Sequence, residues 1–262
     1  MTTLVNRHIR AQPSSFIQWL ALTKRTVRMM RVKGEFIIAV LAPLIFTIGF
    51  YLPLKYVMQV QGIDYAQFVM AIIVLQAMSF TMTSAAAYSA VEAMSGFVER
   101  MQTMPIAPLV PVAARVTGAL IRSTLSLIAA LGFGYLIGFR VYGGPAQTAL
   151  FCLFALGVAT ALALGADVLG LSAKNPASVT QALTLPTLIF GMLSCGFVPE
   201  TGFPAWIRPF VRNQPVSQFS FALRDLADPG ITPGLLGPPL AWLIGMFVIF
   251  LPLAAWASRR RG

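Results

Sequence analysis

Six apolar segments, each long enough to cross a lipid bilayer, follow one another along this chain. A transmembrane helix needs about 20 mostly apolar residues, and in hydrocarbon only helices and closed barrels satisfy their own backbone hydrogen bonds. Hydrophobic residues make up 57% of the 262 residues and charged residues only 10%, too few to cover a water-soluble surface. We therefore expect an all-α membrane protein with six transmembrane helices. The expected spans are about 36–54, 66–88, 112–138, 147–171, 180–197 and 239–257.

The segment before the first span has a different pattern. Residues 14–33 can form a helix capped by Ser14 or Ser15, with Trp19 on its apolar face and four basic residues on another face. A basic amphipathic helix of this kind lies in the interface of an anionic leaflet. No hydrophilic block is long enough to fold alone, so residues 1–262 are expected to form a single membrane domain.

The positions of lysine and arginine predict the orientation. With a cytoplasmic N-terminus, 14 of the 19 basic residues fall on the cytoplasmic side and five outside. Cytoplasmic loops carry such an excess of positive charge. Both termini, the segment 89–111 and the loop with Lys174 are therefore expected in the cytoplasm. The net charge of +11 then reflects membrane topology, and no nucleic-acid partner is expected.

A polar segment, SAVEAMSGFVERMQTMPIAPLVP at 89–111, separates the second and third spans. Helix potential over Ala90–Met104 is followed by three prolines that redirect the chain. A short charged helix on the membrane surface can dock into a groove on a soluble partner, and a solvated connecting loop is the alternative. The candidate contact residues are Glu92, Phe97, Glu99, Arg100, Met101 and Met104.

The chain has no phosphate-binding loop. Such a loop needs Gly-Lys-Ser/Thr, and the four lysines follow Thr, Val, Leu and Ala. Any dependence on ATP must therefore come from another polypeptide. Paired acids, histidine clusters and nucleophile constellations are also missing from the sequence, so we expect no catalytic residues, no metal site and no enzyme activity in this chain.

Three charges fall within the spans or at their ends: Arg115, Arg122 and Asp167. Ionisable groups in a membrane pair with one another or line a polar cavity. With Asp167 taken as the single acid in the spans, a structural ion pair with Arg115 or Arg122 is favoured over a proton relay.

Residues 199–238 form the longest segment that is not simply apolar, and the part at 199–229 predicts two short amphipathic pieces that return into or along the outer leaflet. Aromatic residues in its first half are typical of the headgroup level. The segment could cap the exit of a lipid pathway, or it could be a lipid-facing loop without a role in transport. Its candidate residues are Phe203, Trp206, Phe210, Phe219 and Arg224.

The chain resembles the permease subunits of ABC-2 type exporters, and among them the daunorubicin-resistance-like B subunits of actinobacteria. The resemblance covers about residues 20–258 and is most specific at GFVERMQTMPIAPLVPVAAR (96–115), FGMLSCGFVP (190–199) and FPAWIRPFVRNQPVSQFSFALRDL (203–226). It implies that Glu92–Pro105 is the cytoplasmic coupling helix that meets the ATPase. It also implies an interfacial connecting helix at 14–33 and an extracellular re-entrant hairpin at 199–229.

The resemblance further implies the partners of the chain. An exporter of this kind sits in the bacterial cytoplasmic membrane and contains two copies of an ABC ATPase, which bind ATP and Mg, so this chain needs no cofactor of its own. A second permease, expected to be a different C-type chain, and membrane lipids complete the partners. The implied substrate is hydrophobic or amphipathic: a complex lipid such as phthiocerol dimycocerosate, or an anthracycline-like drug. A non-transporting scaffold or receptor and a polysaccharide exporter permease are the alternatives.

Overall fold

The computed structural model describes residues 14–107, 109–173, 175–230 and 233–260, and every regular element within them is helical. The N-terminal tail and Lys174, both assigned to the cytoplasm above, lie outside the described residues. The elements are α1 (Ser15–Val32), α2 (Glu35–Phe46), the π-helical η1 (Thr47–Tyr51), α3 (Leu52–Val60), α4 (Tyr65–Met94), α5 (Phe97–Gln102), α6 (Val110–Ile137), α7 (Gly144–Ser172), α8 (Pro176–Met192), the 3-10 turn η2 (Glu200–Gly202), α9 (Arg208–Asn213), α10 (Pro215–Ala227) and α11 (Pro233–Arg260).

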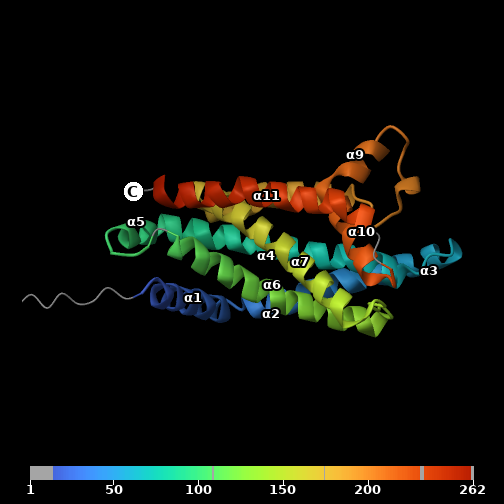
Figure 1. Ribbon diagram of the computed structural model, residues 1–262, viewed down its shortest axis with the longest axis horizontal. Coiled ribbons are helices and arrows are strands. Elements are labelled where there is room, and N and C mark those ends of the chain that lie inside the picture. Colours follow the sequence, from blue (N-terminus) through green and yellow to red (C-terminus); the bar gives the residue numbers. More distant parts are fainter. Residues whose placement is uncertain (1–13, 108, 174, 231–232, 261–262) are drawn as a thin grey trace, which may run out of the picture.

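The long helices lie lengthwise beside one another in a bundle (Figure 1). Helices α1 and α5 lie at one end together with the last turns of α11, and α3, α9 and α10 lie at the opposite end. We call these the α5 end and the α10 end. Five helices in the described residues are long and apolar enough to cross a membrane. They are Glu35–Val60, Tyr65–Met94, Val110–Ile137, Gly144–Ser172 and Gly234–Ser258.

Helix α4 lies at the centre of the bundle. Its residues Val69–Val74 are almost completely buried, because α6, α7, α8 and α10 all pack around it. Asp64 caps its first turn, with the carboxylate accepting hydrogen bonds from the backbone N–H groups of Ala66 and Gln67. A helical segment buried on all sides shows little amphipathic pattern, which is why the sequence at 69–74 is a continuous apolar run.

The first span is longer than the sequence predicted. The expected end was about residue 54, where Pro53 and Lys55 follow the apolar run, but the helix continues to Val60. A proline removes one backbone donor and crowds the preceding turn. The π-helical turns of η1 directly precede Pro53 and widen the backbone there, so the helix passes the proline without ending.

The polar segment forms two helices where one was expected over Ala90–Met104. Helix α4 runs on to Met94, and α5 begins at Phe97 after a sharp turn. Gly96 makes this turn in the left-handed conformation, with a φ of 65°, which residues with a β-carbon adopt only with strain. The turn leaves Glu92 inside α4, away from the exposed part of the segment.

The predicted fifth span, 180–197, corresponds to α8 and the turns that follow it. At 17 residues, α8 is shorter than the other long helices and ends at Met192. It nevertheless runs along α4: Val179 packs in a cluster with Ala86 and Ala90, and Gly196 lies against Ile72. Between Ala90 and Ile72, α4 rises about 27 Å. Helix α8 and its following turns therefore lie beside α4 over about 27 Å of its length.

Candidate functional site

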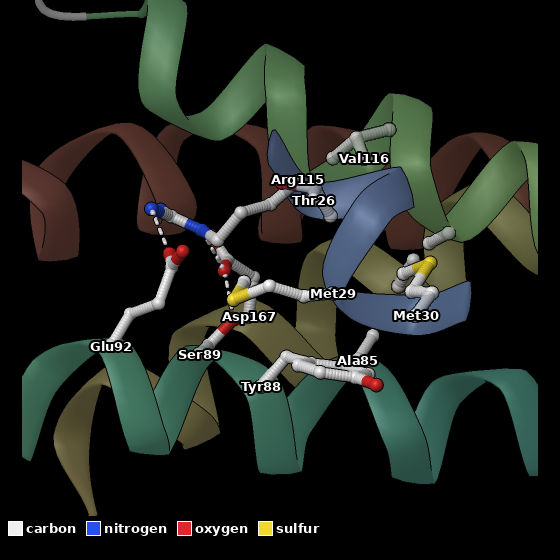
Figure 2. Close-up of a pocket in the computed structure, with 12 residues that line it drawn as sticks. Thr26, Met29, Met30, Ala85, Tyr88, Ser89, Glu92, Arg115, Val116 and Asp167 are labelled. Atoms are coloured by element: carbon white, nitrogen blue, oxygen red, sulfur yellow. Dashed lines mark hydrogen bonds and ion pairs between the residues drawn. The ribbon is translucent and has the colours of Figure 1, made fainter. Parts of the chain in front are cut away.

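Four side chains from three helices meet near the α5 end in the interior of the bundle (Figure 2). Arg115 of α6 points between Glu92 of α4 and Asp167 of α7. Its Nε lies 2.6 Å from Oδ1 of Asp167, its Nη2 lies 3.0 Å from Oδ2, and its Nη1 lies 3.7 Å from Oε2 of Glu92. The hydroxyl of Ser89 donates a further hydrogen bond to Asp167 at 2.5 Å. The structure thus brings Asp167 to Arg115, one of the two arginines that the sequence offered.

Helix α1 contributes a further charged side chain to this group, Arg25. Nη1 of Arg25 lies 2.5 Å from Oε1 of Glu92, and its guanidinium stacks 3.7 Å from the centre of the Phe97 ring. Glu92 is only 5% exposed. The sequence placed Glu92 among the contact residues on the membrane surface, but the structure buries it between two arginines. We call Arg25, Ser89, Glu92, Arg115 and Asp167 the polar network.

Arg122 does not join this network. It lies two turns further along α6, is 1% exposed, and its Nη1 is 2.8 Å from Oε2 of Glu35 at the start of α2. The expectation that Asp167 is the single acid in the spans is wrong, because Glu35 and Glu92 both belong to candidate spans. Each arginine within α6 therefore has its own acidic partner, and the buried charges balance.

The polar network surrounds very little free space. The cavity beside Arg115 and Asp167 has a volume of about 20 Å³. Such a cavity is close to the minimum that one water molecule requires. Its walls combine the network with apolar side chains such as Met29 and Met30 of α1 (Figure 2). A cavity of this size cannot hold a transported molecule. The network therefore serves to connect α1, α4, α6 and α7 through ion pairs and hydrogen bonds.

The residues predicted to contact a partner divide between the two faces of α5. Met101 is buried, Phe97 is partly buried under Arg25, and Val98 packs with residues of α7 and α11. Glu99 and Arg100 are exposed, as is Met104 just after the helix. One face of α5 thus packs against α1, α4, α7 and α11, while the other exposes the carboxylate of Glu99 and the guanidinium of Arg100. The thioether of Met104 is exposed just after the helix.

Helix α1 also holds the proline segment after α5. The side-chain amide of Gln18 donates to the carbonyl of Pro105 at 3.1 Å and accepts from the N–H of Ala107 at 3.2 Å. The indole N–H of Trp19 donates to the hydroxyl of Thr117 on α6 at 3.1 Å. As predicted, Ser14 caps the start of α1, and its side chain accepts a hydrogen bond from the backbone N–H of Ile17. Helix α1 therefore contacts both α5 and the spans.

At the α10 end, α10 packs into the bundle. Phe219 and Leu223, two of its apolar residues, are buried in the main core. The partly buried Arg224 donates hydrogen bonds to the carbonyls of Phe68 at 2.9 Å and Gly196 at 2.7 Å, and it stacks 3.6 Å from the centre of the Phe68 ring. Burial lowers the pKa of its guanidinium to about 10, so Arg224 stays charged at neutral pH.

The aromatic residues before α10 lie in the part of the chain that projects from the bundle around α9 (Figure 1). Trp206 is 80% exposed and Phe210 50%, while Phe203 is partly covered. Between this projection and the start of α11 is a cavity of about 1000 Å³, whose lining includes Arg208, Arg212 and Trp242. The predicted hairpin residues thus form two groups. Phe219 and Arg224 anchor α10 in the bundle, and Trp206 and Phe210 form an exposed aromatic group.

Three members of the polar network were missed in the sequence: Ser89 and the two charged residues Arg25 and Glu92. The two charged residues were missed for different reasons. Arg25 was assigned to the charged face of an interfacial helix, and Glu92 to a surface segment. A signal for both exists: Glu92 precedes Ser95 and Gly96, the first helix-ending signal after the second span, so it still belongs to the span's helix. A carboxylate at the end of a span, opposite a basic helix, predicts an ion pair.

Comparison with known proteins places the chain in a family. Residues 58–256 match the family described as ABC-2 family transporter protein. The doxorubicin resistance ABC transporter permease protein DrrB of Mycobacterium tuberculosis is 37% identical over 252 residues, which cover 91% of this chain and 87% of that protein. The daunorubicin resistance ABC transporter permease protein DrrB1 of Streptomyces coeruleorubidus is 26% identical, over 85% of this chain and 78% of its own length.

A second type of permease is also similar. The probable doxorubicin resistance ABC transporter permease protein DrrC of Mycobacterium tuberculosis is 28% identical over 153 residues, 58% of this chain and 52% of that protein. These matches agree with the apolar helices and with the resemblance seen in the sequence, including its B-type character. The chain is a multi-pass membrane protein that belongs to the ABC-2 family of transporter permeases.

Proposed function

We propose that the chain is the membrane permease subunit of an ATP-driven exporter, and that α5 transmits the motion of a separate ATPase to the spans. The observation that carries this proposal is the two-sided environment of α5. Its inner face is fixed to α1, α4, α7 and α11, and its outer face exposes Glu99 and Arg100. A short helix held in this way moves the helices behind it when a partner pushes on it.

The polar network gives this motion a direct path. Arg25 joins Phe97 of α5 to Glu92, and Arg115 joins Glu92 to Asp167 of α7. Charged hydrogen bonds in a low-dielectric interior are short and directional, so these helices shift together. ATP and Mg would be bound by the partner, in two copies, and this chain contributes no catalytic group.

We further propose six spans with both termini in the cytoplasm. The five long helices account for five crossings, and α8 with its following turns covers about 27 Å of the bundle beside α4. That length is close to the roughly 30 Å of a bilayer core. An even number of crossings also agrees with α1 and the last turns of α11 lying at the same end (Figure 1).

The α10 end would then face outside, with α9 and α10 as a re-entrant hairpin over the exit. The buried contacts of Phe219 and Arg224 support a hairpin that is anchored in the bundle. The substrate we propose is hydrophobic or amphipathic, either a complex lipid or an anthracycline-like drug. The names of the relatives favour the drug class, since DrrB and DrrB1 are described as doxorubicin and daunorubicin resistance permeases.

The role of α5 is tested by the charge reversal Glu99→Arg. Because Glu99 is exposed, the variant should fold and insert as the parent does. A like-charge contact at an interface costs several kcal/mol, so substrate export by membrane vesicles should fall at least about tenfold while ATP hydrolysis by the complex continues. Glu99→Asp, which keeps the charge at the same exposed position, is the matched control and should export normally. Normal export by Glu99→Arg would remove the coupling role of α5.

The composition of the complex is tested by purifying the tagged chain from its native membrane in mild detergent and identifying what accompanies it by mass spectrometry. We expect an ABC ATPase and a second permease of the C type, for which the similarity to DrrC is the supporting observation. Recovery of the ATPase with this chain alone would indicate a homodimer. If neither appears while a control ABC complex stays intact, the chain is a membrane scaffold and the export proposal fails.

A further inference from the structure

Three basic side chains gather in a pocket between α1 and α6. Their positions, 24, 28 and 31, follow the four- and three-residue spacing that places side chains on one side of a helix. The pocket has a volume of about 390 Å³. It is lined by Thr23, Lys24, Val27, Arg28, Arg31 and, from α6, Ile121.

The acidic residues of the chain do not neutralise these cations. All eight Asp and Glu residues lie within the described parts of the structure. At the α5 end, Glu35 pairs with Arg122, while Glu92 and Asp167 pair with the arginines of the polar network. No described carboxylate forms an ion pair with Lys24, Arg28 or Arg31. Among the described residues, these three cations therefore have no carboxylate to balance them, and they can accept an anion from outside the chain.

The apolar part of the pocket indicates what kind of anion fits. Ile121 is 39% exposed and belongs to a candidate span, and Ile128, two turns further along α6, is 63% exposed. On α1, Phe16 and Leu20 are exposed as well. The pocket thus combines cations with a stretch of apolar surface that continues along a membrane helix. A free anion would use the cations alone, whereas a phospholipid would use both.

We propose that this pocket binds the headgroup of a single anionic phospholipid, with its acyl chains lying along α6. Basic pockets between membrane helices bind anionic headgroups. Thr26 of α1 lies so close to Gly118 of α6 that little bulk separates the helices here. A lipid bound to both would hold α1 against α6 beside the polar network. This inference does not depend on which substrate the protein transports.

The test is lipid binding to the full chain in detergent, titrated with phosphatidylglycerol and with neutral phosphatidylcholine, and measured by native mass spectrometry. We expect one phosphatidylglycerol to bind in preference to phosphatidylcholine. The double variant Arg28→Gln/Arg31→Gln should bind phosphatidylglycerol about 30-fold more weakly, at roughly fivefold for each cation. If that variant does not fold, Arg28→Gln alone should show the single fivefold loss, and binding at the parent level would overturn the proposal.

The matched control is Lys33→Gln, the same loss of charge on the residue that caps α1. Lys33 lies 4.7 Å from the centre of the Tyr88 ring on α4, outside the pocket, so its variant should bind as the parent does. A less than fivefold loss in the double variant, or an equal loss in Lys33→Gln, would overturn the site. Displacement of the lipid by excess inorganic phosphate would overturn the assignment to a phospholipid and indicate a site for free anions.

Discussion

Replacement of Asp167 by asparagine should lower the free energy of unfolding by about 3–5 kcal/mol, the range found when one partner of a buried ion pair is removed. Asp167 is 2% exposed, and it accepts two hydrogen bonds from Arg115 and one from Ser89. An amide has one acceptor oxygen and no charge, so Arg115 would stay buried with only the more distant Glu92 as a partner. Unfolding of the purified chain in mixed micelles, with SDS as denaturant, measures the loss.

Removal of both partners should restore most of this stability. In Arg115→Met/Asp167→Leu, no uncompensated charge stays in the interior, and apolar replacements of similar volume are often neutral or stabilising. Glu92 keeps Arg25 as its partner in this variant. Glu99→Gln, at an exposed acid, is the control and should unfold at the parent concentration of SDS. Removal of one partner of an exposed ion pair lowers the free energy of unfolding by less than about 1 kcal/mol. If Asp167→Asn has so small an effect, Asp167 and Arg115 do not form a buried ion pair.

The double variant Arg115→Met/Asp167→Leu also tests whether the ion pair serves only stability or is needed to transmit motion during export. A variant that is stable but exports poorly would mean that the charged contact between α6 and α7 is needed for movement. Full export would mean that packing alone couples these helices. Either result separates the fold from the function of the polar network, which a single substitution cannot do because the two effects overlap.

Much of the fold could be predicted because a bilayer limits which secondary structures can span it. Apolar runs had to be helices, and α4, α6, α7 and α11 lie where hydropathy predicted spans. Helix α1 could also be predicted, from its Ser14 cap and its two faces. Hydropathy is less informative at the ends of spans, where water, headgroups and other helices can each surround a charge. Glu35 and Glu92 lie there: the expected first span began at about residue 36, just after Glu35, and Glu92 was expected in the surface segment at 89–111.

The features that could not be predicted depend on contacts between helices that are far apart in the sequence. Glu92 is buried because α1 lies across it, and nothing local in the sequence positions α1 on α4 and α6. The turn at Gly96 and the π-helical turns of η1 are similar cases, since a glycine or a proline permits a break without fixing its geometry. The pairing of Asp167 with an arginine was predictable because two cations and few acids leave few choices. Which arginine it contacts depends on the rotation of α6 against α7.

Addition of one methyl group at Gly170 should force α4 and α7 apart. A β-carbon built on Gly170 would lie 2.7 Å from the β-carbon of Ser89 and closer still to the backbone oxygen of Ala86. A backbone oxygen cannot rotate away, so the helices themselves must shift. We expect Gly170→Ala to lower the free energy of unfolding by about 1–3 kcal/mol, the usual cost of overpacking. The same unfolding measurement in SDS tests this.

Gly245→Ala is the matched control, because a β-carbon on Gly245 of α11 meets nothing within 4 Å. The substitution to alanine favours helix formation in both variants, so stability should be unchanged or slightly higher in Gly245→Ala. Equal stability of the two variants would show that α4 and α7 can separate at no cost. Because Asp167 precedes Gly170 by about one turn of α7, separation of these helices would also stretch the hydrogen bond from Ser89 to Asp167. Gly170→Ala combined with Asp167→Asn should then cost less than the sum of the two single losses, since both act on one contact.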